Sequence, residues 1–302
     1  MSVEPGTDNG TRCVICGSAG LEEIRPAEID GLDDVSFSYS FSPQHSKTFR
    51  VVRCHACTHQ FCAPLPENLA ERYRDVVDEE YLKHAESRRL AARAVFGTIG
   101  RYAAPGRLLD VGCATGDFLE AGRAAGWAVE GLELSGWSCA IARQRGLTVH
   151  QKTLARFAEE GAEPFDVVTL VGVIEHLPAP RAEMANLARL VRPGGLLVAW
   201  TGDVDSWLAR LLGRRWWYWQ GQHIQYFTHR SLALLARDAG FSTLATERYP
   251  FAATRDTLAN SLRRYPLHRL MSAALAPVFL VAPVITLRLP GEMLFLARRA
   301  AR

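Results

Sequence analysis

The hydrophobic positions of the chain form short apolar runs, separated by longer segments whose apolar residues recur at helical spacing. From residue 105 onward the runs predict strands over 107–111, 128–132, 148–150, 165–170, 196–200, 243–248 and 293–297. The segments between them predict helices over 117–125, 136–145, 181–191 and 231–239. This alternation indicates an α/β fold with a mostly parallel sheet of seven strands and helices on both faces.

The sequence before the core changes, at about residue 66, from short β-like runs to helical periodicity. Residues 66–104 have helical periodicity among many charges, and we expect them to form a helical cap. Tyr73 and Tyr81 are expected to pack on its apolar face, with contact to the cofactor site as the alternative. The sequence thus predicts a small unit over 1–65, the cap over 66–104 and a core over 105–302. Within that core, residues 251–291 form an insertion between the last two strands.

The insertion opens with a basic, polar helix predicted over 257–264 and continues into the apolar stretch 270–289. Pro277 and Pro283 interrupt this stretch, which argues against a helix that spans a membrane. Two interpretations remain: a helical pair packed on the sheet, or a lid or apolar surface that contacts a lipid-linked acceptor or a membrane through 263–289. In the second case four basic residues would face anionic head groups, namely Arg263, Arg264, His268 and Arg269.

Composition and charge limit the function classes. With 302 residues, of which 48% are hydrophobic and 22% charged, the chain can bury a substantial core. The formal net charge of +3 is small and no long basic stripe is present, so nucleic acid is not an expected partner. Because the start of the sequence is polar and lacks an apolar leader, we expect a cytoplasmic protein, with membrane association through the insertion as the alternative.

The cysteine spacing predicts a metal site in the N-terminal unit. Four of the cysteines form two C-x-x-C pairs, Cys13 with Cys16 and Cys54 with Cys57. Two such turns brought together give four-thiolate zinc, a closed structural site that stabilises a unit too small to bury a large core. A redox pair or an iron–sulfur site is the alternative. Other nearby ligand types are Cys62, His55 and His59, which a four-cysteine site does not need.

The turn after the first core strand predicts a nucleotide-type cofactor. Asp110 ends the strand, and Gly112, Ala114 and Gly116 make a turn of small residues that a ligand can approach closely. The second strand ends on an acidic residue, Glu133, as in β-α-β units that bind ribose. The G-x-G-x-x-G pattern of dinucleotide enzymes is missing, which disfavours a dehydrogenase. The alternative is a tight strand–helix turn that binds no cofactor.

Three stretches of the core resemble class I S-adenosylmethionine-dependent methyltransferases, which have a Rossmann-like sheet. D-V-G-C-A-T-G at 110–116 resembles their motif I, and F-D-V-V at 165–168 with G-V-I-E-H-L at 172–177 resembles their motif IV. L-V-R-P-G-G-L-L at 190–197 resembles the turn before their fifth strand. A zinc-ribbon-like N-terminus joined to such a core also resembles methyltransferases that tailor sugars and natural products.

The resemblance implies roles for the cofactor residues. Asp110 would accept a hydrogen bond from the amino group of the cofactor, and Glu133 would take both ribose hydroxyls. The turn would pass under the methionine and ribose, Gly172 and Val173 would lie under the sulfonium, and the remaining residues would lie near adenine. The full implied set is Asp110, Gly112, Cys113, Ala114, Gly116, Glu133, Leu134, Thr153, Leu154, Gly172 and Val173. Lys152-Thr153-Leu154 lacks the acidic residue common in the family at this point, so the adenine contacts are the weaker part of the assignment.

Three residues are candidates for acting on the acceptor. His176 follows the fourth strand and could assist deprotonation or only pack against a backbone carbonyl. The stretch 216–226 is rich in tryptophan and tyrosine and could wall an acceptor pocket or plug the core. Within it, His223 is the preferred base and Tyr226 adds a hydroxyl.

The sequence therefore predicts an enzyme that methylates a small molecule at oxygen or carbon. The acceptor classes are a sugar, a natural product or a lipid-linked metabolite. The competing hypothesis is a nucleic-acid- or protein-binding module that uses the zinc ribbon, with the core as a cofactor-binding scaffold. No feature of the sequence predicts an oligomeric state.

Overall fold

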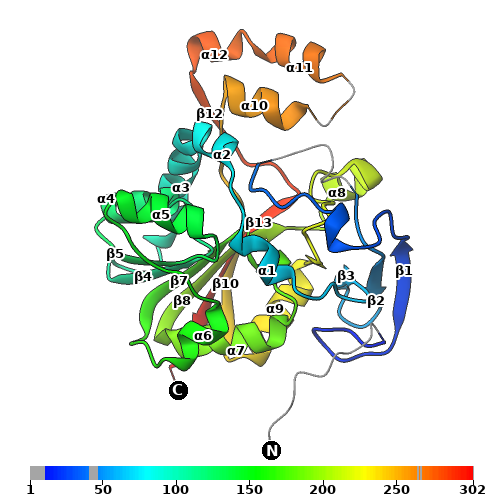
Figure 1. Cartoon of the computed structure of the whole chain (residues 1–302), viewed down its shortest axis with the longest axis vertical. Coiled ribbons are helices and arrows are strands. Elements are labelled where there is room, and N and C mark those ends of the chain that lie inside the picture. Colours follow the sequence, from blue (N-terminus) through cyan, green and yellow to red (C-terminus); the bar gives the residue numbers. More distant parts are fainter. Residues whose placement is uncertain (1–10, 41–46, 264, 266, 302) are drawn as a thin grey trace, which may run out of the picture.

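The core of the protein is a seven-stranded sheet in a computed structural model that describes residues 11–40, 47–263, 265 and 267–301 (Figure 1). The strand order is β10-β13-β8-β7-β4-β5-β6. Only β13 runs antiparallel to its neighbours, so the sheet is mostly parallel, as predicted. The bounds are β4 Arg107–Val111, β5 Ala128–Leu132, β6 Thr148–His150, β7 Phe165–Val171, β8 Val191–Gly202, β10 Phe241–Arg248 and β13 Glu292–Arg299.

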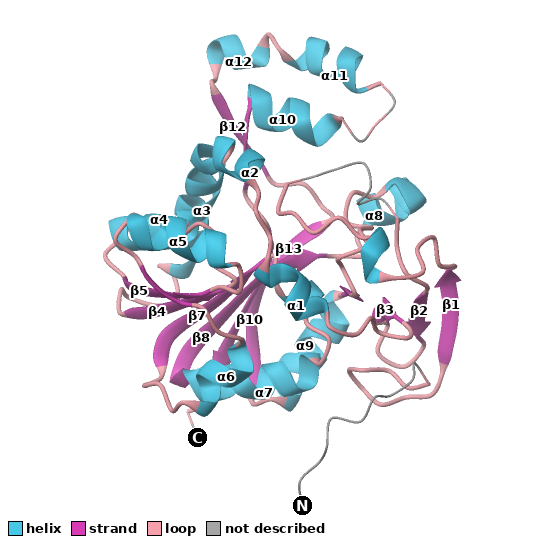
Figure 2. Ribbon diagram, in the orientation of Figure 1, coloured by secondary structure: helices cyan, strands magenta, loops and turns pink. Residues whose placement is uncertain are grey.

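Helices cover both faces of this sheet (Figure 2). One buried cluster joins the sheet to α3 (Ala85–Ile99), α4 (Asp117–Ala124) and α5 (Gly136–Gln144). A second joins the other face to α6 (Leu154–Glu159), α7 (Pro180–Leu190) and α9 (His229–Asp238). Apolar residues buried on both faces explain why strands such as β7 are apolar along their length.

The fifth predicted strand is longer than expected because the turn before it belongs to the strand. Val191 already pairs with Phe165, and pairing resumes at Leu196 with Val167. The residues between, 192–195, form a bulge in which Gly194 has φ of 75°. The predicted P-G-G turn is therefore present as an irregularity inside β8.

The N-terminal unit forms a small antiparallel sheet, which we call the ribbon, and a strand from the core completes it. Its strands are β1 (Leu21–Arg25), β2 (Val51–Cys54) and β3 (Gln60–Cys62), in the order β1-β2-β3-β9. The fourth strand, β9 (Gln225–Tyr226), comes from the segment that follows β8. Residues 35–37 follow a short 3-10 turn, η1 (Leu32–Asp34), and belong to no strand.

The cap consists of α1 (Leu69–Arg74), α2 (Glu79–Lys83) and the long α3. The insertion consists of two paired antiparallel strands, β11 (Phe251–Thr254) and β12 (Val284–Leu287), with three helices between them. These are α10 (Arg255–Leu262), α11 (His268–Leu275) and α12 (Val278–Val281), and they project beyond the rest of the molecule (Figure 1). Among the described residues, no helix is long and apolar enough to cross a membrane.

A buried hydrogen bond from His59, just before β3, to Gln225 in β9 links the N-terminal sheet to the core. His59 Nε2 donates to Gln225 Oε1 at 2.8 Å, and Gln225 Nε2 donates to the Leu177 carbonyl at 3.1 Å. Gln225→Leu removes both bonds and leaves buried polar groups without partners, so we expect a loss of about 1–3 kcal/mol in unfolding free energy. Urea denaturation measures this loss. The exposed Gln144→Leu is the matched control and should change stability by less than about 0.5 kcal/mol; equal stability of the two variants would contradict the prediction.

Candidate functional site

Two positions of the turn after β4 are so close to neighbouring side chains that only glycine fits there. Gly112 has φ of 72°, and a Cβ there would lie 2.4 Å from Val173 Cγ2. Gly116 has φ of 88°, and its Cβ would lie 2.3 Å from Leu147 Cδ1. Ala114 also adopts a positive φ, 45°, which a non-glycine residue takes only under constraint. The sequence therefore uses small residues where the backbone must pass closely beside the carboxyl ends of β4 and β7.

Glu133, at the end of β5, holds this turn through its carboxylate. Oε2 accepts the backbone N–H of Ala114 at 2.9 Å, while Oε1 accepts those of Leu134 at 2.7 Å and Ser135 at 2.8 Å. Burial raises the pKa of Glu133, and the three backbone donors oppose that rise. Ser135 also caps α5, because its side chain accepts the N–H of Ser138.

Asp110 and Thr115 add polar groups to the same edge. Asp110 is buried at the end of β4 and accepts a hydrogen bond of 2.6 Å from Thr169 Oγ1. Burial raises the pKa of Asp110 to about 7. Thr115 Oγ1 is buried and has no hydrogen-bond partner among the described residues. A small-residue turn, two buried carboxylates and an unsatisfied hydroxyl together suit a polar ligand such as S-adenosylmethionine.

A tyrosine from the N-terminal unit also reaches Glu133, which the sequence did not suggest. Tyr39 Oη donates to Glu133 Oε1 at 3.2 Å, and its ring lies 5.0 Å from the ring of Tyr81 on α2. The neighbouring Ser40 bonds to Asp78 through its backbone N–H at 2.7 Å and its hydroxyl at 3.1 Å. We call residues 35–40 the strap, because they connect the ribbon to the cofactor edge.

The predicted adenine residues have local structural roles here. Thr153 caps α6 through its side chain, and Leu154 is buried in the core. Leu134 is partly exposed beside Glu133, whereas Cys113 is buried. Gly172 has φ of 70° and a Cβ there would lie 3.0 Å from Trp200, so this turn also needs glycine.

His176 and His223 lie side by side, with ring centroids 4.8 Å apart. His176, at the end of η3 (Ile174–His176), has Nδ1 2.8 Å from the Gln222 carbonyl oxygen and 2.9 Å from Tyr73 Oη. His223 Nδ1 is 2.7 Å from the Tyr218 carbonyl oxygen. Because carbonyl oxygens only accept, Nδ1 of His223 bears the proton and its Nε2 is the basic nitrogen. His176 has backbone hydrogen bonds with both Gln222 and Gly172. Burial lowers the pKa of His176 to about 4, so this ring is neutral near neutral pH.

Glu175, to which the sequence assigned no role, organises the histidine pair. It is buried, and it accepts hydrogen bonds from the hydroxyls of Tyr218 and Thr201. Burial raises its pKa to about 7. Tyr218 thus contacts Glu175 through its side chain and His223 through its backbone. Its ring fits against Gly202, where a Cβ would lie 2.4 Å away.

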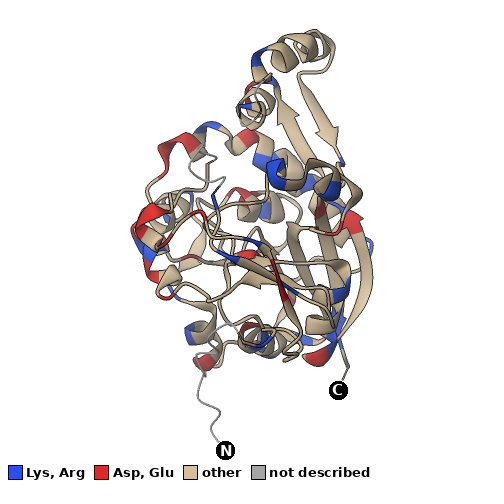
Figure 3. Ribbon diagram, turned by 90° about the vertical axis from the view of Figure 1, so that its right-hand side faces the viewer, with Lys and Arg blue, Asp and Glu red and all other residues tan. Residues whose placement is uncertain are grey.

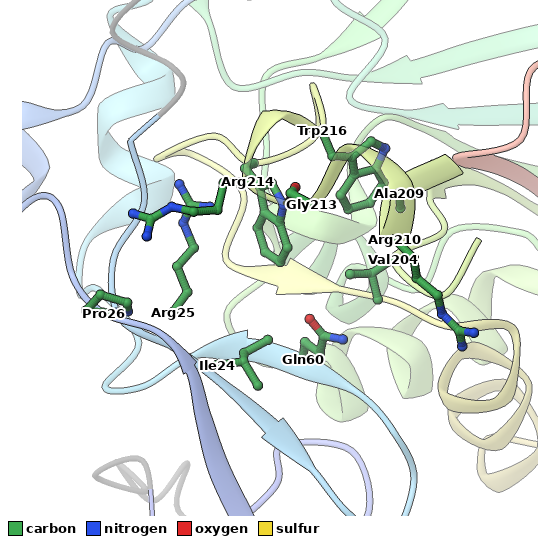
Figure 4. Close-up of a pocket in the computed structure, with 11 residues that line it drawn as sticks. Ile24, Arg25, Pro26, Gln60, Val204, Ala209, Arg210, Gly213, Arg214 and Trp216 are labelled. Atoms are coloured by element: carbon green, nitrogen blue, oxygen red, sulfur yellow. Dashed lines mark hydrogen bonds between the residues drawn. The ribbon is translucent and has the colours of Figure 1, made fainter. Parts of the chain in front are cut away.

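The aromatic stretch mostly fills the core, and Tyr226 lies apart from the histidine pair. Trp216, Tyr218 and Tyr226 are buried in one cluster under the ribbon, and Tyr226 Oη donates to the Gln220 carbonyl at 3.3 Å. A pocket of about 270 Å³ opens on this side between β1, β3 and α8 (Trp207–Leu212) (Figure 4). Its lining includes Arg25 and Arg214, whose guanidinium groups both bond to Glu28.

The four predicted metal ligands come together in two matching turns. Gly17 N–H bonds to the Cys13 carbonyl and Thr58 N–H to the Cys54 carbonyl, and both Gly17 and Thr58 have positive φ. All four sulfurs lie within 4.8 Å of one another, with Cys13 Sγ 3.5 Å from Cys57 Sγ and Cys16 Sγ 3.5 Å from Cys54 Sγ. Tetrahedral zinc with Zn–S bonds of about 2.3 Å needs sulfurs about 3.8 Å apart, so the cluster could hold such an ion.

Sequence reasoning missed two contributors to the site, Tyr39 and Glu175, and ranked a third, Tyr73, as the less favoured of two alternatives. Tyr39 is far from Glu133 in sequence and belongs to no motif. Glu175 lies inside the quoted G-V-I-E-H-L block, and its position next to His176 was the available signal. Tyr73 was expected mainly to pack, yet its hydroxyl contacts His176.

Comparisons with known proteins agree with this geometry. A family model described as a methyltransferase domain matches residues 78–246. The ubiquinone biosynthesis O-methyltransferase of Cereibacter sphaeroides is 33% identical over 146 residues, which cover 44% of this chain and 59% of that protein. The enzyme of the same name from Hahella chejuensis is 38% identical over 101 residues, covering 31% of this chain and 42% of that protein. The chain therefore spans only about half the length of the curated relatives it matches.

A solved structure shares the fold. A SAM-dependent methyltransferase from Archaeoglobus fulgidus superposes with a TM-score of 0.52 at 16% identity, over 74% of this chain and all of that one. The family match spans more than half of the present chain, and it includes the glycine turn, Glu133 and His176. The chain therefore belongs to the methyltransferase-domain family and shares the fold of that structure.

Proposed function

We propose that the enzyme transfers a methyl group to a hydroxyl oxygen of a small-molecule acceptor, and that the pair His176 and His223 accepts the hydroxyl proton. The observation that carries the proposal is the pair of histidine rings, 4.8 Å apart, in segments that follow the carboxyl ends of β7 and β8. Relatives named as O-methyltransferases support oxygen over carbon as the acceptor atom. A sugar, a natural product or a lipid-linked metabolite are the acceptor classes to be tested.

The cofactor is assigned to the residues at the ends of β4, β5 and β7. Glu133 would bind the ribose hydroxyls, because the two oxygens of a carboxylate match a vicinal diol. Asp110 would face the amino group, and Gly112 and Gly116 would leave room for the cofactor beside the turn. When bound, S-adenosylmethionine supplies a methyl group already activated by its sulfonium, so the protein needs mainly to orient the acceptor and take up a proton.

His223 suits the proton-accepting role because its hydrogen bond to a carbonyl oxygen fixes its tautomer. His223 is held by the Tyr218 carbonyl, and Tyr218 is in turn held by Glu175. With the proton on Nδ1, Nε2 can take the hydroxyl proton as the new oxygen–carbon bond forms. His176 is neutral near neutral pH and is the second candidate. Tyr226 bonds to a backbone carbonyl in the core, which gives this residue a packing role in the proposal.

The four cysteines are assigned to a structural zinc ion. A site of four thiolates has no open position for water or substrate, so it stabilises the ribbon and takes no part in methyl transfer. The ribbon leads into the strap, whose Tyr39 contacts Glu133, so the metal also supports the cofactor edge indirectly.

Replacing Glu133 should weaken cofactor binding. Glu133→Gln turns one carboxylate oxygen into an amide that faces backbone N–H groups, and we expect a loss of at least about tenfold in affinity for S-adenosylmethionine. Isothermal titration calorimetry measures the change. Glu130→Gln, on the same strand but bonded to Arg107 and His150, is the control and should bind like the wild type. Equal affinity in all three proteins would reject Glu133 as the ribose ligand.

Zinc content tests the N-terminal assignment. We expect one zinc ion per chain by elemental analysis, and Cys16→Ser should lose the metal and lower the melting temperature, since only three thiolates remain. Cys62→Ala removes a buried cysteine outside the cluster and should keep the metal. The assignment is overturned if the wild-type protein, purified without added zinc, contains iron or no metal at all.

Turnover tests the proposed base. With a catechol and an alkyl glycoside as probe acceptors, S-adenosylhomocysteine release and the site of methylation on the product can be followed together. His223→Ala should lower turnover by about 100-fold or more while leaving cofactor affinity unchanged. His55→Ala, on the exposed surface of the ribbon, is the control. If both His223→Ala and His176→Ala turn over like the wild type, neither histidine is the base.

A further inference from the structure

The tip of the insertion exposes apolar side chains that no described residue covers. Neither α11 nor α12 has a single buried residue. Leu280 is 86% exposed and Val281 is 90% exposed, which is unusual for aliphatic residues in a helix. Further exposed apolar residues lie beside them, namely Leu267, Leu270, Met271, Leu275 and Val278. So many exposed apolar side chains in one short segment indicate a contact with another phase or molecule.

The charge around this tip is strongly one-sided. Residues 255–289 contain five arginines and a single acidic residue, Asp256. Arg255, Arg263, Arg269 and Arg288 are exposed, whereas Arg264 lies outside the described residues. In Figure 3 the protruding insertion shows blue and little red. Arg263 and Arg269 lie just before and within α11, beside the apolar tip, whereas Arg288 bonds to the Arg248 carbonyl at the base of the insertion. Basic residues beside an exposed apolar segment are typical of segments that lie in the interface of an anionic membrane.

The insertion is attached where the proposed chemistry takes place. β13 starts at Glu292, which pairs with Gly202 at the carboxyl end of β8, and β10 ends beside it. Both ends of the insertion therefore leave the sheet at the edge that holds Glu133 and the histidine pair. The base of the insertion is fixed there, because Trp200 and Trp217 both donate their indole N–H groups to Glu292.

The base also contacts the cap over the cofactor edge. Ser87 Oγ and Thr257 Oγ1 are 2.7 Å apart, joining α3 to α10. The next residue of α3, Arg88, bonds to Asp117 and stacks over the ring of Tyr81, which packs on Tyr39. A surface bound by the tip would therefore face the same edge of the sheet as the cofactor residues.

We propose that the insertion docks the protein on an anionic lipid surface, with α11 and α12 in the interface and the surrounding arginines on the head groups. A lipid surface fits better than a second copy of the chain, because two such tips would bring their arginines together without acidic residues to pair them. The inference rests on the insertion alone and holds whether or not the proposed histidine roles do. For the proposed function, it favours a lipid-linked acceptor over a soluble one.

Vesicle co-sedimentation of the full-length protein tests the proposal. The probes are vesicles of phosphatidylcholine alone and vesicles that also contain phosphatidylglycerol. We expect binding to the anionic vesicles only, and we expect it to weaken as salt is raised, because the arginine–head group attraction is screened.

Two pairs of variants separate the apolar and the charged contributions. The double variant Leu280→Ser and Val281→Ser should weaken vesicle binding by at least about tenfold, because two exposed aliphatic groups no longer enter the interface. Leu211→Ser, at a residue 73% exposed on α8, is its control and should bind normally. Arg263→Glu with Arg269→Glu should weaken binding to anionic vesicles to a similar degree, whereas Arg189→Glu on α7 should not.

Three results would overturn the proposal. The first is that the protein binds neither vesicle, and the second is that the Leu280 and Val281 substitutions leave vesicle binding unchanged. The third is that the protein binds no vesicles but forms concentration-dependent dimers in sedimentation velocity, which these substitutions abolish. Calorimetry with S-adenosylmethionine on the same variants should give wild-type affinity. That readout keeps a failure of lipid docking distinct from a failure of the proposed cofactor site.

Discussion

A buried carboxylate held by backbone amides is the constraint on which the site depends. Glu133 accepts N–H groups from Ala114, Leu134 and Ser135, and it can do so only if the turn after β4 passes close to the end of β5. That approach requires small residues in left-handed conformations, which Gly112 supplies. The parallel order of the strands then brings Asp110 and the histidine pair to the same edge.

The ribbon and the core are joined more closely than their order in the chain indicates. β9 extends the ribbon sheet, and the His59–Gln225 bond is fully buried between them. Through the strap, Tyr39 then contacts Glu133 itself. A metal that orders the ribbon would therefore affect the cofactor edge without contacting it. Loss of a structural zinc ion would then also weaken cofactor binding.

The predictable features were those with a local signal. The strands at 107–111 and 128–132 were predicted to the residue, because each is a short, largely apolar run bounded by turn residues. β9 was not predictable, since a strand of two residues has no periodicity and forms only by pairing with β3. Tyr39 and Tyr73 reach the site through tertiary contacts, which a pattern along the chain does not contain.

The central claim is that the carboxyl edge around Glu133 binds S-adenosylmethionine, and a direct titration of the wild-type protein tests it. Calorimetry with S-adenosylhomocysteine, the product form that no acceptor can consume, isolates binding from chemistry. We predict saturable binding at one site per chain, in full-length protein shown by circular dichroism to be folded. Folded protein that takes up neither this ligand nor S-adenosylmethionine would contradict the account.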